Sequence, residues 1–467
     1  MSVFTEPLKD YSIIEDIKTT IKKKKTPIRV TGCAGAQKCN LISAVSEEYP
    51  VKLVIAENEI KAKEIAFDLS LYDKNVYLYP EKDILFYSAD VRGNTIQCER
   101  LAILKRIING ESITVVAGIA AAMDRLPKKE RMQSGIIHID LNYQSEPETL
   151  AKKLVEIGYI REGIAELPGQ FAVRGGIVDI FPVQEEVPVR IEFWGDAIDS
   201  IRSYDPSSQR SIENIKETDV YPAQEIVVSS EEIDYGLKNI EKDAKKLEKK
   251  FHDASDDKAA ANLRKTINEL KENLEFIRGS VGLESYVNYF LGDTVSFLEY
   301  FDPGKTLYFL DEPQKTVESL RALELEFGES MKGRLENGYI LPGQTDAVFD
   351  SGYILSELSG KNLLLLSTMD YRFSVVPALT TYELSVSGTA SYNGNFEMLI
   401  SDLLKWKKRK YRVILLAASR SRGIRLAEDL RDNDITAVYS DDLERSCNEG
   451  EVIVMSGLSA VALSILL

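Results

Sequence analysis

The stretch "PIRVTGCAGAQKCN" (Pro27–Asn40) is the strongest single indication of the fold class. A short β-rich run, Pro27–Val30, leads into a turn that contains glycines, and an apolar helix start follows the turn. A strand, a glycine turn and a helix in this order form the phosphate-binding unit of many nucleotide-binding α/β domains. The stretch therefore predicts an α/β domain and raises the question of whether its loop binds a nucleotide.

The sequence beyond this stretch continues to alternate between helical and strand-like segments. Further strand candidates are Val51–Ile55, Val76–Tyr79 and Ile113–Val116, and helical patterns such as "NEIKAKEIAFDLSLY" lie between them. This alternation predicts a parallel sheet covered by helices. We therefore expect a P-loop-like (RecA-type) parallel-sheet domain.

The loop departs from a working phosphate-binding loop, which reads G-x-x-x-x-G-K-[ST]. Gly32 opens the frame and Lys38 occupies the lysine position. Gln37 replaces the second glycine, Cys39 replaces the Mg²⁺-binding hydroxyl, and Gly35 lies out of frame. A side chain is strained where the turn needs a positive φ, and a thiol is a poor ligand for Mg²⁺. Three interpretations stay open: an ordinary strand–turn–helix, a degenerate nucleotide loop, or a working ATPase.

A second motif bears on that choice. "TLYFLDEP" (Thr306–Pro313) is an apolar strand that ends in Asp311 and Glu312. In P-loop ATPases an acidic pair in this position holds Mg²⁺ and activates the attacking water. The alternative is an exposed acidic pair where a strand enters a turn. Together with Lys38, the acidic pair indicates descent from an ATPase.

The middle of the chain carries its most distinctive text, "LPGQFAVRGGIVDIFP" (Leu167–Pro182), followed by "PVRIEFWGD". The second run alternates, so Val189, Ile191 and Phe193 form one face of a strand. Arg190 and Trp194 then point outward together, which is the composition of an interface hot spot. The alternative is a tryptophan covered by another domain of the same chain.

Composition excludes several classes of protein. The chain has 467 residues, 44% of them hydrophobic and 28% charged, as expected for several folded domains. A net charge of −16 disfavours tight binding to a phosphate backbone. Four cysteines without CxxC spacing and two histidines predict no metal site and no catalytic residue. No signal pattern or long apolar run is present, so we expect a cytoplasmic protein without membrane contact.

Changes in composition predict four segments. Residues 1–125 form the first half of the α/β domain, and residues 126–222 form an inserted α+β domain of short strands broken by Gly, Pro and Asp. Residues 223–343 form the second half and include a charged helical segment, "IEKDAKKLEKKFHDAS". Its simplest interpretation is a solvated helical hairpin, because acidic residues mixed with the lysines argue against a nucleic-acid grip. Residues 344–467 form a small α/β domain that is truncated at its end.

Several long motifs, in order, carry a family resemblance. They are "LYPEKDILFYSADVRGNTIQCERLAIL" with its terminal Arg100-Leu101, "GQFAVRGGIVDIFP", "VRIEFWGDAIDSIRSYD", "QRS" and "YPA". The chain resembles the N-terminal part of the bacterial transcription-repair coupling factor along nearly its whole length. Residues 1–340 resemble the module that this family shares with the excision-repair protein UvrB.

The resemblance implies that the first domain is an inactive relative of an ATPase. Gly32 and Lys38 match the family loop, and Asp311 and Glu312 match its acidic box. The two replacements within the loop imply that no cofactor is needed, with ATP and Mg²⁺ bound only if weak affinity remains. The chain itself is then not an enzyme, whereas the full-length family is an ATP-dependent DNA translocase.

The resemblance also assigns a partner. In the family the inserted domain binds the damage-recognition protein UvrA, and the contact positions fall on Arg174, Arg190 and Trp194. Position 194 is usually phenylalanine in the family, so tryptophan keeps a flat anchor but adds bulk. The alternative for Arg174 is a turn arginine paired with Asp179 or Glu192. RNA polymerase and DNA are expected to bind only through family domains that would follow residue 467.

The last residues depart from the family text. "GEVIVMSGLSA" fits the third small domain of the family, whereas "VALSILL" (Val461–Leu467) does not. A nucleotide string that encodes this heptapeptide gives Gly-Phe-Glu-Tyr-Pro-Leu, the family text, in another frame. We hypothesise a frameshift or a split reading frame, which sequencing of the locus would test.

Overall fold

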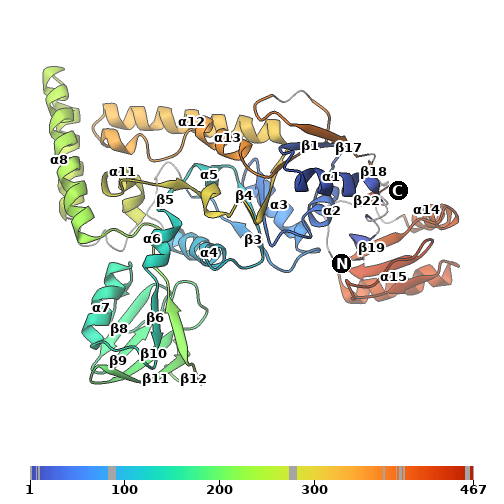
Figure 1. The fold of residues 1–467 in the computed structure, drawn as a ribbon, viewed down its shortest axis with the longest axis horizontal. Coiled ribbons are helices and arrows are strands. Elements are labelled where there is room, and N and C mark those ends of the chain that lie inside the picture. Colours follow the sequence, from blue (N-terminus) through green and yellow to red (C-terminus); the bar gives the residue numbers. More distant parts are fainter. Residues whose placement is uncertain are drawn as a thin grey trace.

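The computed structural model shows an α/β body that carries one lobe on its underside and a helical hairpin at one end (Figure 1). The described residues are 3–6, 8, 11–82, 91–272, 281–371, 374–384, 386–388, 392, 395–457 and 463–465. Part of the motif that precedes Arg100 and most of Val461–Leu467 lie outside this range. The frameshift hypothesis therefore concerns residues that the structure largely does not describe.

A seven-stranded sheet forms the body, in the order β17-β1-β16-β15-β2-β4-β3. Every neighbouring pair in it is parallel. The strands are β1 (Ile28–Thr31), β2 (Val51–Ala56), β3 (Val76–Tyr79), β4 (Ile113–Gly118), β15 (Thr306–Asp311), β16 (Leu363–Leu366) and β17 (Thr380–Glu383). The predicted fold class, a parallel α/β sheet with an inserted domain, is confirmed.

Helices cover both faces of this sheet, as parallel sheets require. They are α1 (Ser12–Lys22), α2 (Ala36–Val45), α3 (Glu59–Leu69), α4 (Val91–Ile108), α5 (Ala120–Met123), α12 (Pro313–Glu336) and α13 (Ser351–Ser359). In β16, Leu363 and Leu365 pack into the core beneath α4, α12 and α13. Leu364 and Leu366 pack into a second core beneath α1, α2 and α3. Burial on both faces explains why this strand is an unbroken run of leucines.

The large sheet extends further along the chain than the sequence predicted. Strands β16 and β17 pair with β1 on its two sides, although both follow residue 343. The expected start of the small domain at residue 344 therefore cuts through the large sheet. The physical reason is that β16 is apolar on both faces. Both faces are buried only if the strand lies in the middle of a sheet that helices cover on both sides.

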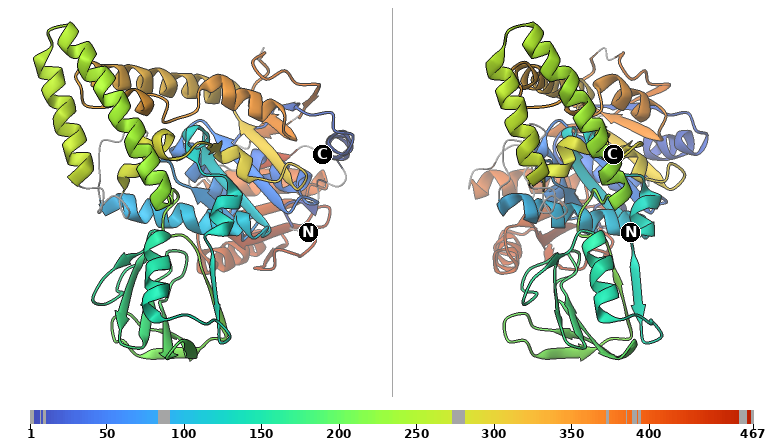
Figure 2. Two further views of the ribbon diagram at one scale, coloured as in Figure 1. Left: turned by 60° about the vertical axis from the view of Figure 1, so that its left-hand side comes forward. Right: turned by 90° about the vertical axis from the view of Figure 1, so that its left-hand side faces the viewer.

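The lobe below the sheet consists of a six-stranded sheet, in the order β12-β11-β10-β9-β8-β7, and one helix (Figure 2). The elements are α7 (Pro147–Glu156), β7 (Ile160–Arg161), β8 (Gln170–Arg174), β9 (Ile177–Ile180), β10 (Val189–Trp194), β11 (Ala197–Tyr204) and β12 (Ser211–Asn214). A separate pair, β6 (Ile137–Asp140) and β13 (Glu217–Val220), joins the lobe to the body, and α6 (Lys129–Ser134) precedes it. The lobe interrupts the large sheet between β4 and β15, as an inserted domain does.

A buried ion network connects the end of the inserted domain to the body. Arg100 on α4 donates from Nε to Glu225 Oε1 at 2.6 Å and from Nη2 to Asp124 Oδ2 at 2.6 Å. Lys82 Nζ lies 2.7 Å from Glu225 Oε2 and 2.5 Å from Glu284 Oε1. Burial opposes the charge on Glu225, but Arg100 and Lys82 lower its pKa to about 2. Arg100, which belongs to one of the family motifs, therefore stabilises the fold by pairing with Glu225 and Asp124.

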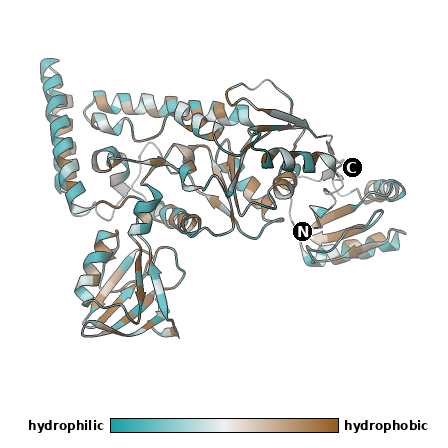
Figure 3. Cartoon of the chain, viewed as in Figure 1, coloured by the Kyte–Doolittle hydropathy of each residue, from teal (hydrophilic) through white to brown (hydrophobic). Residues whose placement is uncertain are grey.

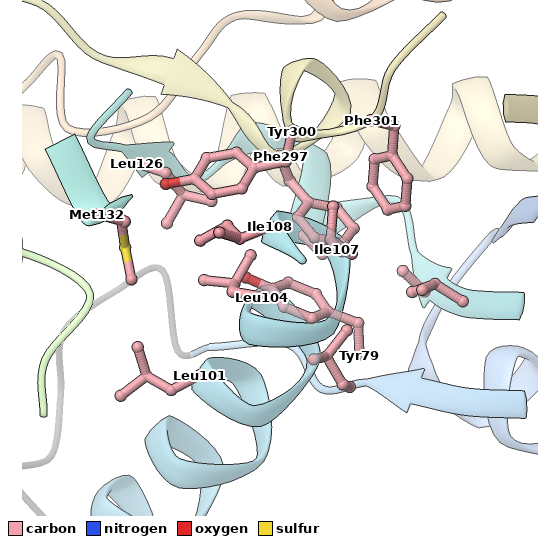
Figure 4. Packing of buried hydrophobic residues seen from close by; sticks show 14 of the residues in the cluster. Tyr79, Leu101, Leu104, Ile107, Ile108, Leu126, Met132, Phe297, Tyr300 and Phe301 are labelled. Carbon is pink, nitrogen blue, oxygen red and sulfur yellow. The ribbon is translucent and has the colours of Figure 1, made fainter. Parts of the chain in front are cut away.

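Aromatic side chains fill the core next to this network (Figure 4). The rings of Tyr79 and Phe297 stack with centroids 3.9 Å apart, and Phe301 meets Phe297 edge-on at 5.1 Å. The guanidinium of Arg100 lies 4.2 Å from the centre of the Tyr79 ring. Such contacts add to the burial energy of the rings and hold the second half of the domain against the first.

The charged helical segment forms a hairpin at one end of the molecule (Figure 2). Its helices are α8 (Ser230–Asp253) and α9 (Asp257–Glu272). They pack on α11 (Val287–Phe290) around a small core of their own. Short elements follow at η2 (Val281–Tyr286), β14 (Val295–Ser296), η3 (Phe297–Tyr300) and η4 (Pro342–Gln344), with β14 paired to β5 (Arg125–Leu126).

The C-terminal unit is a three-stranded parallel sheet in the order β19-β21-β20. Its elements are α14 (Phe396–Lys408), β19 (Val413–Ala417), α15 (Arg420–Asp432), β20 (Ala437–Tyr439) and β21 (Val452–Ser456). A further antiparallel pair joins β18 (Val386–Gly388) and β22 (Leu463–Ile465). Strands are mostly apolar and outer helix surfaces polar across the molecule (Figure 3), and no helix in the described part is long and apolar enough to cross a membrane.

Candidate functional site

The glycine loop between β1 and α2 has positive φ angles at Gly32 and Gly35, whereas Gln37, where the sequence suggested strain, lies in α2 without a positive φ. Gly32 adopts φ +79°, and a Cβ on it would lie 2.2 Å from the carbonyl oxygen of Leu384. Gly35 adopts φ +52° where α2 begins. The first glycine is therefore required both by its backbone angle and by the close approach of the chain after β17.

The side chains at the two replaced positions, Gln37 and Cys39, make contacts inside the protein. The Oε1 atom of Gln37 accepts a hydrogen bond from the backbone N–H of Ala34 at 3.1 Å. In a working loop such N–H groups point at phosphate oxygens, so this side chain occupies one of them. Cys39 lies in the core under α1 and α3. Burial raises the pKa of the Cys39 thiol, and it raises the pKa of nearby Cys33 to about 12.

Lys38 binds both members of the acidic pair. Its Nζ lies 2.5 Å from Asp311 Oδ1 and 2.6 Å from Glu312 Oε1, and the three side chains are 9 to 15% exposed. Glu312 also accepts hydrogen bonds from the backbone N–H of Thr368 at 3.0 Å and from its hydroxyl at 2.5 Å. The structure thus brings together the loop lysine and acidic residues from a strand 273 positions away. The alternative of an exposed acidic pair is wrong.

The charges in this triad depend on one another. Burial opposes the charge of Lys38, but Asp311 and Glu312 outweigh it and raise the pKa of the lysine. Burial would also raise the pKa of Glu312, yet hydrogen bonds from Lys38 and Thr368 lower it. Burial raises the pKa of Asp311 even with Lys38 beside it. To reach a phosphate, Lys38 would have to leave two carboxylates without a counter-charge. The three side chains link the loop between β1 and α2 to the turn between β15 and α12, and we call Lys38, Asp311 and Glu312 the clasp.

The second group of predicted residues lies on the solvent face of the six-stranded sheet. Asp179 on β9 is fully buried at its centre and forms ion pairs with two arginines. Arg190 on the neighbouring strand donates to it through Nε at 2.7 Å and Nη2 at 2.9 Å. Arg174 at the end of β8 donates to the same carboxylate through Nη2. Its pairing with Asp179 is one of the two that the sequence suggested.

The two arginines differ in how freely they can meet a partner. Arg190 has only 14% of its side chain exposed, whereas Arg174 has 43%. Gln209 accepts further hydrogen bonds from Arg190, and the ring of Tyr204 lies 4.5 Å from its guanidinium. Sequence reasoning did not predict either contact with Arg190; the signals were the motifs that contain the two residues, "VRIEFWGDAIDSIRSYD" for Tyr204 and "QRS" for Gln209. We call Arg174, Asp179, Arg190, Trp194 and Gln209 the charged sheet face.

Trp194 ends β10 with 85% of its surface exposed. The strand has the predicted alternation, because Val189, Ile191 and Phe193 are buried and Trp194 is not. A register shift between Glu192 and Phe193 marks an irregularity just before the turn. No described part of the chain covers this ring, so among the described residues nothing supports the alternative of an intramolecular cover. An exposed indole costs solvation energy without an evident structural return.

Comparison with known proteins gives this geometry its context. Residues 137–226 match the family model described as the UvrB interaction domain. Over 432 residues, 92% of this chain, the sequence is 31% identical to the transcription-repair-coupling factor of Bacillus subtilis. The protein of the same name from Staphylococcus aureus strain USA300 is 22% identical over 98% of the chain. That from Staphylococcus epidermidis strain RP62A is 23% identical over 92%.

The predicted resemblance to transcription-repair-coupling factors is confirmed. The chain spans 36 to 38% of the length of these relatives, which corresponds to their N-terminal part. The charged sheet face lies entirely within residues 137–226, the region matched by the UvrB interaction domain. The clasp around Lys38 lies outside it.

Proposed function

We propose that this chain is a recruitment module that binds UvrA through the charged sheet face and has no nucleotide chemistry of its own. The observation that carries the proposal is the 85% exposed Trp194 at the end of β10, the same strand that carries Arg190, whose guanidinium is oriented by the buried Asp179. An aromatic anchor next to preoriented arginines is the usual composition of an interface hot spot. The match of residues 137–226 to a UvrB interaction domain supports UvrA as the partner.

The clasp supports the second half of the proposal. Lys38 is the residue that a phosphate would need, and two carboxylates hold it within 2.6 Å. Gln37 fills one loop N–H that a phosphate would use. A metal-bound nucleotide would therefore have to break three internal contacts before making its own. The cost of uncovering buried charges makes this loop a poor nucleotide site.

The test is the affinity of the purified chain for UvrA, measured by calorimetry or biolayer interferometry. Trp194→Ala and Arg174→Ala should each weaken binding by more than about 1 kcal/mol if they are anchors. Arg190→Ala should weaken it as well, but it also uncovers Asp179, so its thermal stability has to be measured in parallel. Tyr339→Ala is the control, because Tyr339 is an aromatic residue outside the inserted domain that is 54% exposed. Unchanged affinity across the three variants would exclude this surface.

The rival function is a weak ATPase or helicase subunit that uses Lys38, Asp311 and Glu312. The meeting of these three side chains in one place is the observation in its favour. A phosphate-release assay with and without DNA separates the two functions. DNA-stimulated turnover that disappears in Lys38→Ala would favour the enzyme.

The wider role follows from the family. We propose that UvrA binding by this module hands a stalled RNA polymerase to nucleotide excision repair. In that scheme the contacts with polymerase and the ATP-driven movement on DNA belong to other parts of the full-length proteins. The module supplies the docking surface.

A further inference from the structure

Helix α8 separates the charges that are mixed in its sequence. Its buried side consists of Ile233, Gly236, Ile240, Leu247 and Phe251. Gly236 allows the closest approach, since a Cβ there would lie 2.2 Å from the Phe290 ring. This apolar side fixes which residues of the helix face the solvent.

Between Lys238 and Lys249 the acidic residues lie on the flanks of the buried side and are paired there, whereas Glu231, Asp234 and Asp253 towards the two ends of α8 are exposed. Glu241 binds Lys271 of α9 at 2.6 Å. Glu248 binds Arg264 of α9, and Asp243 lies 3.3 Å from Lys246. Of the three negative charges between Lys238 and Lys249, two are therefore paired with α9 and the third with a lysine of α8 itself.

A row of lysines remains on the side opposite the core. Lys238, Lys242, Lys245 and Lys249 are all exposed and follow one another at intervals of four, three and four residues. With 3.6 residues per turn, this spacing places all four in one stripe along about 16 Å of helix. Among the described residues, none of the four forms a salt bridge. We call these residues the lysine row; α8 carries it along the end of the molecule furthest from α14 and α15 (Figure 1).

We propose that the lysine row binds the phosphate backbone of duplex DNA without regard to sequence. Each lysine is a flexible point charge on a long stem, which suits phosphates that lie at uneven distances from a straight helix. Contacts of this kind position a protein on DNA and carry no base information. The row adds a weak DNA contact to a module whose other proposed partner is a repair protein.

The surface around the row favours DNA over an acidic protein. Stable protein interfaces have an apolar or aromatic core within the charged rim. No apolar residue interrupts the stripe between Lys238 and Lys249, and the exposed Tyr235 lies only at its end. A chain with net charge −16 also needs a local concentration of positive charge to approach DNA at all, and the row supplies one.

The experiment is fluorescence anisotropy of a short labelled DNA duplex titrated with the 467-residue chain at several salt concentrations. Four neutralised phosphates predict that the affinity falls by about 100-fold between about 50 and 200 mM salt. Changing all four lysines to glutamine should abolish most of this dependence and weaken binding at low salt by at least about tenfold. Glutamine has nearly the helix propensity of lysine, so far-UV circular dichroism and the Tm should stay unchanged.

The matched control removes the same number of charges elsewhere. Lys22, Lys23, Lys24 and Lys25 are exposed at the end of α1, and their change to glutamine should leave DNA binding unaltered. An equal loss of DNA affinity in both variants would mean that only the net charge of the chain matters, and it would overturn the proposal. Absence of DNA binding by the unmodified chain at low salt would also overturn it. If the row variant then lost affinity for polyglutamate instead, the row would serve an acidic polypeptide.

Discussion

The clasp around Lys38 and the charged sheet face are built from the same chemistry and differ in exposure. In both, a buried carboxylate holds a cation: Asp311 holds Lys38, and Asp179 holds Arg190 and Arg174. In the clasp every charged side chain is 15% exposed or less, whereas on the sheet face Arg174 is 43% and Trp194 85% exposed. A cation closed on all sides stabilises the fold, and one held at the surface is available to a partner.

The difference explains how the loop could keep its lysine and acidic pair after losing two loop positions. Once Lys38, Asp311 and Glu312 are buried together, removing any one of them leaves the others without a counter-charge. The triad is then retained for stability, whatever happens to nucleotide binding. Mutations that separate stability from binding test whether the two sites differ in this way.

The largest effect is expected from Lys38→Ala. The change leaves Asp311 and Glu312 buried without their cation, and it should lower the free energy of unfolding by about 3 kcal/mol or more. Urea denaturation followed by circular dichroism measures the effect. Lys22→Ala, which breaks an exposed pair with Glu48, should change nothing measurable. A loss in Lys38→Ala no larger than in this control would show that the clasp is not structural.

A smaller loss is expected from Asp179→Asn. The amide keeps the shape of the side chain but removes the charge that Arg174 and Arg190 share, so we expect about 2 kcal/mol of destabilisation. Affinity for UvrA should fall as well, because both arginines lose their orientation. Calorimetric melting and a binding titration on the same sample separate the two effects. Full affinity in Asp179→Asn would mean that the carboxylate does not orient the binding surface.

Trp194→Ala should affect binding and leave stability alone. The ring is 85% exposed, so its removal costs no core packing, whereas an anchor loses more than about 1 kcal/mol of affinity for UvrA. Trp194→Phe should bind nearly as well as the unmodified chain, since it keeps a flat apolar side chain. A Tm that falls in Trp194→Ala would show that the ring has a structural contact instead.

The smallest effect concerns the loop cysteines. Burial raises the pKa of Cys33 from 9.0 to about 12, so the folded thiol stays protonated at neutral pH. Because the pKa of Cys33 is higher in the folded than in the unfolded chain, its contribution to the free energy of unfolding is fully present below about pH 9. That contribution is lost as the pH rises toward 12. Among the four cysteines, the half-buried Cys98 should label first with a thiol reagent at neutral pH. Mass spectrometry of labelled peptides checks the order, and early labelling of Cys33 or Cys39 would mean that the loop opens.

Periodicity was enough to predict the elements whose burial is regular. Five strands of the large sheet, β1, β2, β3, β4 and β15, and the alternation in β10 follow from side-chain spacing, and so does the outward position of Trp194. The meeting of Lys38 with Asp311 could be suggested because both motifs end or follow strands of one parallel sheet. Their burial could not be predicted, since exposure depends on which helices cover that edge.

Other features depend on contacts that leave no local pattern. Strand β17 is partly exposed and joins the sheet only through its pairing with β1, so nothing in its sequence marks it as part of the large domain. The separation of charges on α8 depends on which side packs against α9 and α11. The support of Arg190 by Gln209 joins residues 19 positions apart through a turn. In each case the partner, rather than the residue itself, determines the role.

The most direct test of the account measures UvrA binding and ATP turnover on the same preparation of the 467-residue chain. We expect saturable UvrA binding that Trp194→Ala weakens and that added ATP with Mg²⁺ leaves unchanged, together with no phosphate release. Phosphate release that requires Lys38, or UvrA affinity that is the same in Trp194→Ala, would contradict this expectation.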